Sequence, residues 1–212
     1  MRMGNSVYEI TFLRHGESQA NLAGYFQGQS DTSLTDKGIA QVQSLIQRWL
    51  SEQIQFDQLI SSPLLRAKQT AEMISLAFNT PLEVNDLWLE RDTGELTGVD
   101  RKEATMLDYF KDFYTPFDLM GRTGEGDWAL FLRAGQALAD IFKRDPGKYL
   151  VVSHGGIMNQ ALRAISGVLP QANSMGVQYS FVNTSFATVH YYPDNYRWQI
   201  LGINDHSHVK SL

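Results

Sequence analysis

The sequence predicts an α/β protein, a three-layer α/β/α sandwich built around a mostly parallel central sheet. Short apolar runs typical of buried strands alternate along the chain with longer segments whose apolar residues recur at helical spacing. The segment 185–203 is instead typical of a β-hairpin that turns at 193–195. The 212 residues are enough for one domain, and we expect a single domain, 1–212, with a lid-like insert at about 101–126.

The first part of the chain predicts a strand, a long loop and a helix. Residues 7–13 form an apolar run typical of a buried strand, and a loop rich in Gly, Ser, Asn and Gln follows to about Leu34. Thr35 is a favourable N-cap for a helix that ends near Gln53. The apolar residues of this helix recur at helical spacing: Ile39, Val42, Leu45, Ile46, Trp49 and Leu50.

The middle of the chain continues the alternation. Residues 56–62 predict a second strand, and a helix then opens at Ser62 and Pro63, with proline at its favoured first position. Residues 81–90 predict a third strand that runs into a loop. A helix over 101–114 follows.

The last part predicts two further helices around a fourth strand. The first helix covers Asp127–Arg144, the strand covers 148–154, and the second helix covers 155–167, ahead of the hairpin.

Polar or ionisable side chains follow four of the predicted strands, at the point where each strand ends. Ligands of parallel sheets bind beyond the carboxyl ends of the strands, so we expect these side chains to meet at one edge. They are Arg14, His15, Ser61, Ser62, Arg66, Glu90, Ser153 and His154. The helices expected to begin near Pro63 and Gly155 would point their amide groups at the same edge.

Composition limits the partners that this chain can have. It carries 18 Lys and Arg against 23 Asp and Glu, a net charge of −5, so we expect no nucleic-acid partner and only a local anion site. The absence of cysteine excludes disulfides and thiolate nucleophiles. The amino terminus lacks the apolar core of a signal peptide and no apolar run reaches membrane-spanning length, so we expect no membrane partner and a cytoplasmic location.

The residues at the sheet edge suit phosphoryl transfer. Arginine forks bind phosphate oxygens and stay charged, so Arg14 and Arg66 can hold a phosphate group. That leaves His15 free to attack phosphorus, since a neutral imidazole is a usable nucleophile near neutral pH. Glu90 is then the natural acid for the leaving oxygen, although Asp86, Asp92 and Glu95 lie nearby in the sequence.

Five sequence blocks together resemble the histidine phosphatase superfamily, the phosphoglycerate mutase-like group. "LRHGES" is followed by Asn21, and "FQGQSDTSLTDKG" carries Gln27 and Gly28. "SSPLLRAKQTAE" carries Arg66, "LERDTGELTG" carries Glu90, and "VVSHGG" carries His154. The blocks occur in family order and cover most of the chain, so the resemblance implies a phosphoglycerate mutase-like fold.

The resemblance also implies a two-step mechanism without a metal or other cofactor. His15 takes the phosphoryl group and becomes phosphohistidine, while Arg14, Arg66 and His154 stabilise the charge on its oxygens. Glu90 protonates the departing alcohol and then deprotonates the water that releases phosphate. Further phosphate contacts are expected from Asn21, Gln27, Gly28 and Gly155.

Three functions remain open within this resemblance. Lys102 could stand for the substrate lysine of a phosphoglycerate mutase, but the insert is short and has only Lys111 where mutases carry paired arginines. We therefore prefer a phosphatase acting on a small phosphorylated metabolite, with mutase-type transfer as the alternative and a non-catalytic phosphoester-binding module as the different-class alternative. The natural substrate and the oligomeric state cannot be read from the sequence.

Two other groups of residues allow both a structural and a functional interpretation. His206 and His208 are expected in a solvated tail rather than in a metal site. Aromatic residues of the insert could line an apolar substrate site or form a lid helix packed on the core, and the sequence favours neither.

Overall fold

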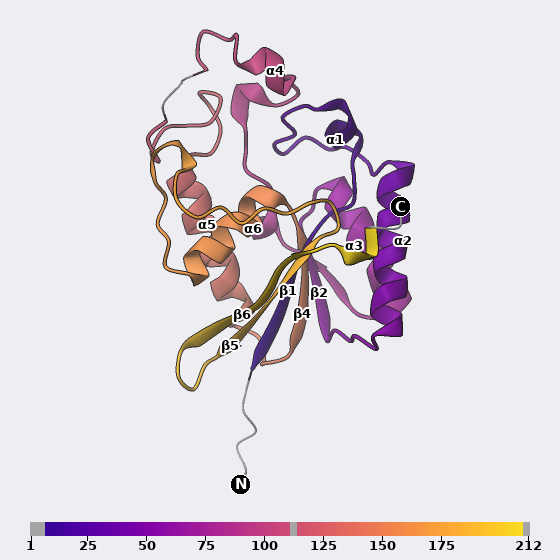
Figure 1. Cartoon of the computed structure of the whole chain (residues 1–212). Helices are drawn as coiled ribbons and strands as arrows, with labels where there is room; N and C mark the ends of the chain where they lie inside the picture. The colour runs from indigo at the N-terminus through magenta and orange to yellow at the C-terminus, as the bar shows by residue number, and fades with distance from the viewer. Residues whose placement is uncertain (1–6, 111–113, 210–212) are drawn as a thin grey trace.

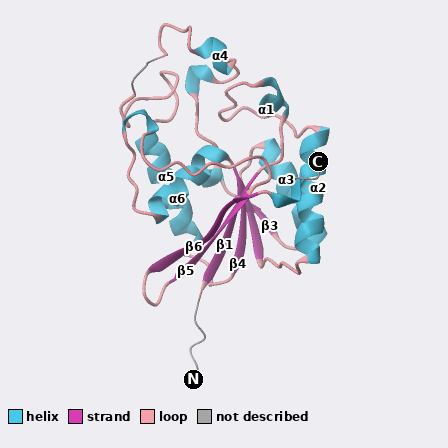
Figure 2. Cartoon of the chain, viewed as in Figure 1, coloured by secondary structure: helices cyan, strands magenta, loops and turns pink. Residues whose placement is uncertain are grey.

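The computed structural model describes residues 7–110 and 114–209, and their core is a six-stranded sheet. The strands are β1 Tyr8–Arg14, β2 Gln58–Ser61, β3 Leu82–Val84, β4 Lys148–Ser153, β5 Phe186–Tyr192 and β6 Arg197–Asp205. Their order is β3-β2-β4-β1-β5-β6 (Figures 1 and 2). The first four are parallel, whereas β5 and β6 form the antiparallel hairpin that the sequence predicts. The predicted α/β class with a mostly parallel sheet is confirmed.

Helices cover both faces of the sheet, as a three-layer sandwich requires (Figure 1). The longer helices are α2 Asp36–Ser51, α3 Leu65–Phe78, α5 Asp127–Ile141 and α6 Gly155–Ile165. α5 and α6 share one hydrophobic core with Ile10 and Phe12 of β1. α2 and α3 share a second core with Leu13, because successive side chains of a strand point to opposite faces.

Helix α2 begins and packs as its sequence pattern predicts. The Thr35 side chain accepts a hydrogen bond from the amide of Gly38 at 3.0 Å, which satisfies a free donor of the first turn. The centre of the apolar stripe is buried, including Val42 and Trp49. Ile39 and Leu50 lie at its margins, where 38% and 46% of their surface remains exposed.

Two starts of helices differ from the sequence predictions. The loop after His15 contains a short helix, α1 Gln19–Ala23, which a reciprocal capping box between Ser18 and Asn21 stabilises. Helix α3 begins at Leu65 rather than at Pro63. The reason is that Ser62 continues the extended strand, its amide donating to the carbonyl of Val152.

The predicted helix over 101–114 is wrong beyond its first turn. Helix α4 covers only Arg101–Ala104, and the residues that follow up to Phe110 form turns. A short helix needs an apolar face packed on the core, but 85% of Met106 is exposed and within α4 only Ala104 is buried. The part of the predicted helix at 111–113 lies outside the described residues.

The expectation of a solvated tail is wrong for His208. The 3-10 helix η4, Ser207–Val209, lies against α2, and His208 is only 7% exposed. The physical reason is a set of polar contacts to α2, in which Ser44 donates to the carbonyl of His208 and Arg48 pairs with Asp205.

α1 and α4 lie beyond the carboxyl ends of the parallel strands (Figure 1). Among the described residues, 7–110 and 114–209, no helix is both long enough and apolar enough to cross a membrane.

Candidate active site

His15 directly follows β1 and is buried, with 2% of its surface exposed. Its Nδ1 lies 2.7 Å from the carbonyl oxygen of Gly16. Because a carbonyl only accepts, Nδ1 carries the proton and the lone pair of the neutral ring is on Nε2. Burial, and next the charges of Arg66 and Arg14, hold the pKa of His15 well below its ordinary value of 6.5. The ring is therefore neutral at neutral pH, and its Nε2 lone pair carries no proton.

His154 lies beside His15, and the two ring centroids are 5.1 Å apart. Its Nε2 is 2.8 Å from Ser62 Oγ. Burial, followed by the charge of Arg66, lowers the pKa of His154 well below 6.5. Within the described part of the chain its buried Nδ1 has no hydrogen-bond partner.

Arg14 and Arg66 bring fixed positive charge to the two histidines. Arg66 donates its terminal nitrogens to the carbonyls of Ser30 and Gly28, at 2.7 and 2.9 Å. Arg14 donates one terminal nitrogen to the carbonyl of Phe181. The Nε atoms of both arginines are buried and find no partner among residues 7–110 and 114–209. Burial lowers the pKa of Arg66 to about 10, so the group still carries its charge at neutral pH.

Glu90 sits between the arginines and the start of α6. Its Oε2 accepts from the amide of Gly156 at 3.1 Å, and its Oε1 accepts from the amide of Arg91 at 2.7 Å. Its charge opposes the lowering of the pKa of both Arg14 and Arg66, which places the carboxylate in the same electrostatic site. A Cβ at Gly156 would lie 2.3 Å from Glu90 Oε1, so only glycine fits there without moving the carboxylate.

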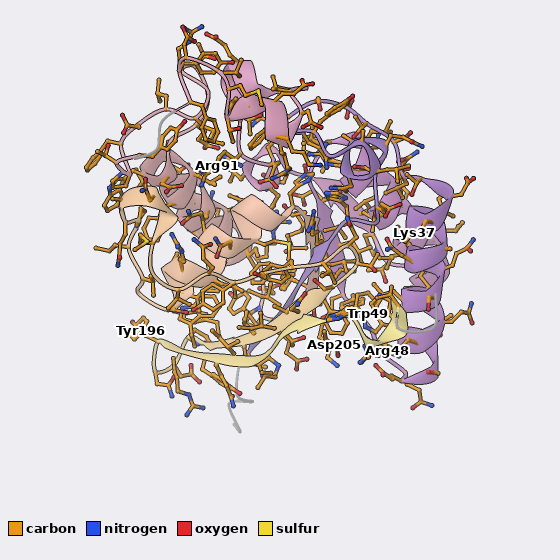
Figure 3. The ribbon with its side chains drawn as sticks, turned by 45° about the horizontal axis from the view of Figure 1, so that its top comes forward. Lys37, Arg48, Trp49, Arg91, Tyr196 and Asp205 are labelled. Carbon is orange, nitrogen blue, oxygen red and sulfur yellow. The ribbon has the colours of Figure 1, made fainter. Side chains whose placement is uncertain are left out.

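Arg133, on α5, hydrogen-bonds to the backbone of residues 87–90, which carries Glu90. It donates to the carbonyls of Leu87, Leu89 and Glu90 at 3.1, 2.6 and 3.1 Å. Arg133 donates two further hydrogen bonds, at 2.9 and 2.6 Å, to the carboxylate of Glu125, which neutralises its charge. Arg91 extends this support to α5 through its ion pair with Asp127 (Figure 3 labels Arg91). Reasoning from strand ends misses Arg133, because it lies inside a helix.

The expected phosphate contacts Asn21, Gln27 and Gly28 lie in the adjoining loop. Asn21 Oδ1 accepts from the amide of Ser18 at 3.1 Å, and Gln27 Oε1 accepts from the Ser18 hydroxyl at 3.0 Å. Gly28 has φ +49°, and a Cβ there would lie 2.3 Å from Thr93 Oγ1. In the described contacts, these three residues order the loop and support Arg66.

The two helix starts contribute differently to the site. Gly155 lies against Arg14, since a Cβ built on it would be 3.9 Å from Arg14 Nε. At α3 the expectation is wrong for the first turn, because the amide of Leu65 donates to Asp31 Oδ1 at 2.7 Å. That amide is occupied by the protein's own carboxylate.

Asn183 and Thr184, just before β5, hydrogen-bond to the backbone where β1 ends at Arg14 and His15. The amide of Thr184 donates to the carbonyls of Arg14 and His15, at 3.1 and 3.2 Å. The side-chain amide of Asn183 donates to the carbonyl of His15 at 3.1 Å. Neither residue is among the site residues that the sequence predicts. Their position ahead of a strand, at the sheet edge that receives the other strand ends, was the available signal.

Comparison with known proteins places the chain in a family. Residues 10–206 match the histidine phosphatase superfamily, branch 1. A metal-independent phosphoserine phosphatase of Arabidopsis thaliana is 35% identical over 219 residues, covering 100% of this chain and 87% of the relative. The uncharacterized phosphatase PhoE of Bacillus subtilis is 28% identical, covering 96% and 97%. A crystal structure of a phosphoserine phosphatase of Entamoeba histolytica, in complex with 3-phosphoglyceric acid, superposes with a TM-score of 0.79 at 24% identity, covering 95% of this chain and 99% of that one.

The chain belongs to the histidine phosphatase superfamily, and its fold is that of the phosphoglycerate mutase-like structures. It is a phosphoric monoester hydrolase of this superfamily, the enzyme class that the sequence motifs predict.

Proposed function

We propose that this protein hydrolyses small phosphomonoesters without a metal ion, through a phosphohistidine formed on His15. The observation that carries the proposal is a set of three buried N–H groups around the His15 ring, in which the proton of His154 lies on Nδ1 because the Ser62 hydroxyl is taken to donate to Nε2. Arg14 Nε, Arg66 Nε and His154 Nδ1 lack partners among the described residues. Buried donors without partners are costly, and an anion with several acceptor oxygens satisfies all three at once.

The first step is transfer to the enzyme. The lone pair on His15 Nε2 attacks phosphorus, the new P–N bond forms, and the ester P–O bond breaks. Glu90 acts as the general acid and passes a proton to the leaving oxygen, so the alcohol departs neutral. Arg14, Arg66 and His154 stabilise the charge on the three remaining phosphoryl oxygens throughout.

The second step returns the enzyme to its starting state. Glu90, now a carboxylate, takes a proton from water, and the oxygen of that water attacks phosphorus. The P–N bond breaks, phosphate leaves, and the electron pair returns to His15 Nε2. The hydrogen bond from His15 Nδ1 to the carbonyl of Gly16 keeps the same tautomer through both steps.

Phosphoserine is the first substrate to test, since the Arabidopsis thaliana relative is named a metal-independent phosphoserine phosphatase. The enzyme is incubated with excess chelator, mixed with phosphoserine or an aryl phosphate, and quenched. Wild-type protein is expected to release phosphate and to trap acid-labile phosphate on His15. His15→Ala is expected to do neither, whereas His190→Ala, a matched control on β5, retains both.

Two results would refute parts of this proposal. Loss of turnover with chelator, restored by a divalent ion, would refute metal independence. Substantial turnover by His15→Ala would assign the nucleophile to another group.

Mutase-type transfer is the alternative, and the charged residues near the insert argue against it. A mutase must hold the substrate carboxylate while the phosphohistidine waits for a second hydroxyl. Arg122 is paired with Glu95 and lies over the ring of Tyr109, at 4.3 Å from its centroid. Arg101 lies over the ring of Phe26, at 4.8 Å, and Lys102 is exposed.

We therefore expect phosphate release to exceed isomerisation. Phosphorus NMR with 3-phosphoglycerate, with and without its bisphosphate primer, follows both products in one tube. Isomerisation faster than phosphate release would replace this proposal with the mutase alternative.

We also propose that the segment at about 101–126 is a lid-like insert of a single domain. Two backbone hydrogen bonds join the residues just before this segment to the loop that follows α1. The amide of Phe26 donates to the carbonyl of Val99 at 2.9 Å, and the amide of Gly98 donates to the carbonyl of Phe26 at 2.8 Å. The cytoplasmic location stays a prediction.

A further inference from the structure

Thr184 supports the nucleophile loop in a backbone conformation that a β-branched residue rarely adopts. Its amide is shared by the carbonyls of Arg14 and His15, and the residue is fully buried. Its φ is +57°, in the left-handed region that disfavours a branched side chain. Such a conformation persists only where surrounding contacts determine it, so the groups that hold Thr184 also determine where the His15 loop lies.

The side chain of Thr184 is hydrogen-bonded to the ring of His208. The distance from His208 Nε2 to Thr184 Oγ1 is 3.0 Å. The Thr184 hydroxyl gives its single proton to the carbonyl of Asn183, at 2.7 Å. Thr184 Oγ1 must therefore accept from His208, which assigns the proton of the neutral His208 ring to Nε2.

The His208 ring stays neutral in this position. Burial, and next the charge of Arg48, lowers the pKa of His208 to about 4, while Asp205 and Glu52 oppose the lowering and His206 adds to it. At neutral pH the ring therefore acts as a single N–H donor to Thr184.

The turn that carries His208 is attached to α2 by several polar contacts. The hydroxyl of Ser44 donates to the carbonyl of His208 at 2.6 Å. Arg48 donates two hydrogen bonds to the carboxylate of Asp205, at 2.7 and 2.8 Å, and a third to Ser207 Oγ at 2.7 Å. Figure 3 shows Arg48 and Asp205 next to each other beside Trp49. η4 is thus held by α2 on one side while His208 reaches Thr184 on the other.

We propose that His208 is a positioning residue for the nucleophile, acting through Thr184 on the backbone of Arg14 and His15. The residue lies beyond the segment 10–206 that matches the family. η4 would then contribute to catalysis by positioning His15, although it contributes no group that touches the substrate. The inference rests on the proposed role of His15.

The test compares two substitutions of His208. His208→Leu removes the donor at similar volume, whereas the side-chain amide of His208→Gln can donate from a position near that of Nε2. For His208→Leu we expect kcat and the rate of phosphoenzyme formation to fall at least tenfold, with KM changed less than threefold, because the phosphate-binding N–H groups remain. His208→Gln should restore kcat to within about threefold of the wild type.

Tyr8→Phe is the matched control for a purely structural effect. It removes a hydrogen bond of a buried residue, from Tyr8 Oη to the carbonyl of Arg144 at 2.8 Å, far from the site. We expect it to lower the melting temperature without changing kcat. Should His208→Leu fail to fold, His208→Asn takes its place, because its shorter amide stops short of Thr184.

A measurement on the resting enzyme separates this inference from the proposed function. The ¹⁵N resonances of the His15 ring should shift in His208→Leu and return in His208→Gln, whether or not phosphohistidine forms. Unchanged His15 resonances together with wild-type kcat in His208→Leu would overturn the inference. Shifted resonances in a protein that never traps phosphate would instead refute the proposed function and leave the positioning role standing.

Discussion

Replacing Arg133 with methionine tests how the protein holds Glu90, the residue proposed as general acid. The substitution removes three hydrogen bonds to the carbonyls of residues 87, 89 and 90, and it leaves Glu125 without its partner. The side chains of Arg133 and Glu125 are 17% and 15% exposed. Removing one partner of a buried ion pair costs about 3–5 kcal/mol, and this partly solvated pair belongs at the lower end, about 3 kcal/mol. For a chain of this size that lowers the melting temperature by roughly 6–12 °C.

The expected loss of activity is larger than a loss of stability alone explains. Without Arg133 the backbone of Glu90 is no longer fixed, and a misplacement of about 1 Å can cost on the order of 100-fold in rate. We expect kcat to fall by roughly 10- to 100-fold, with KM little changed, because Arg14, Arg66 and His154 are untouched. Steady-state kinetics at a temperature well below both unfolding transitions measures the two constants.

The double variant Arg133→Met with Glu125→Leu separates the two effects. It leaves no unpaired buried charge, so most of the lost stability should return. Its kcat should stay low, because the carbonyl of Glu90 still lacks its donor. A double variant with wild-type kcat would refute the reasoning, since it would show that Glu90 keeps its place without the guanidinium.

Two further predictions follow from the same contacts. Gly156→Ala should lower kcat by about tenfold or more, because the added Cβ would lie 2.3 Å from Glu90 Oε1 and would displace the carboxylate. The melting temperature should be nearly unchanged, because alanine favours the helix more than glycine does. A lower melting temperature together with an unchanged kcat would contradict this prediction. Acidification should destabilise the protein, because His15, His154 and His208 have folded-state pKa values below 6.5 and the unfolded chain binds more protons. Their contribution is complete above pH 6.5 and is lost as the pH falls toward the lowered values, by about 1.4 kcal/mol per pH unit for each histidine. Urea unfolding between pH 7.5 and 5 measures the slope, and a flat profile would mean that these rings are not buried in the neutral form.

The sequence by itself determined the order of strands and helices, and it placed the residues that we propose as reactive groups at one edge of the sheet. Thr35 predicts the start of α2, and the apolar runs predict β1 and β4, because capping and burial patterns are local properties. Arg14, His15 and His154 could be placed because each directly follows or ends a strand, and the carboxyl ends of parallel strands share one edge. Local patterns gave a wrong prediction where tertiary packing determines the secondary structure. The helix predicted from Arg101 is an example, because it has almost no apolar face packed on the core and α4 covers only Arg101–Ala104.

Only the tertiary structure decided how those groups are held and which protons they carry. The tautomer of His15 depends on the carbonyl of Gly16, and the neutral state of both site histidines depends on burial beside Arg14 and Arg66. Arg133 reaches Glu90 across 43 residues of sequence, and no periodicity of α5 indicates which carbonyls it will bind. His208, expected in solvent, is buried because polar contacts with α2 hold η4 and the preceding Asp205 against that helix. The physical reason is the same in each case: a hydrogen bond between distant segments depends on where the whole fold places its donor and acceptor, and neither neighbouring sequence determines that position.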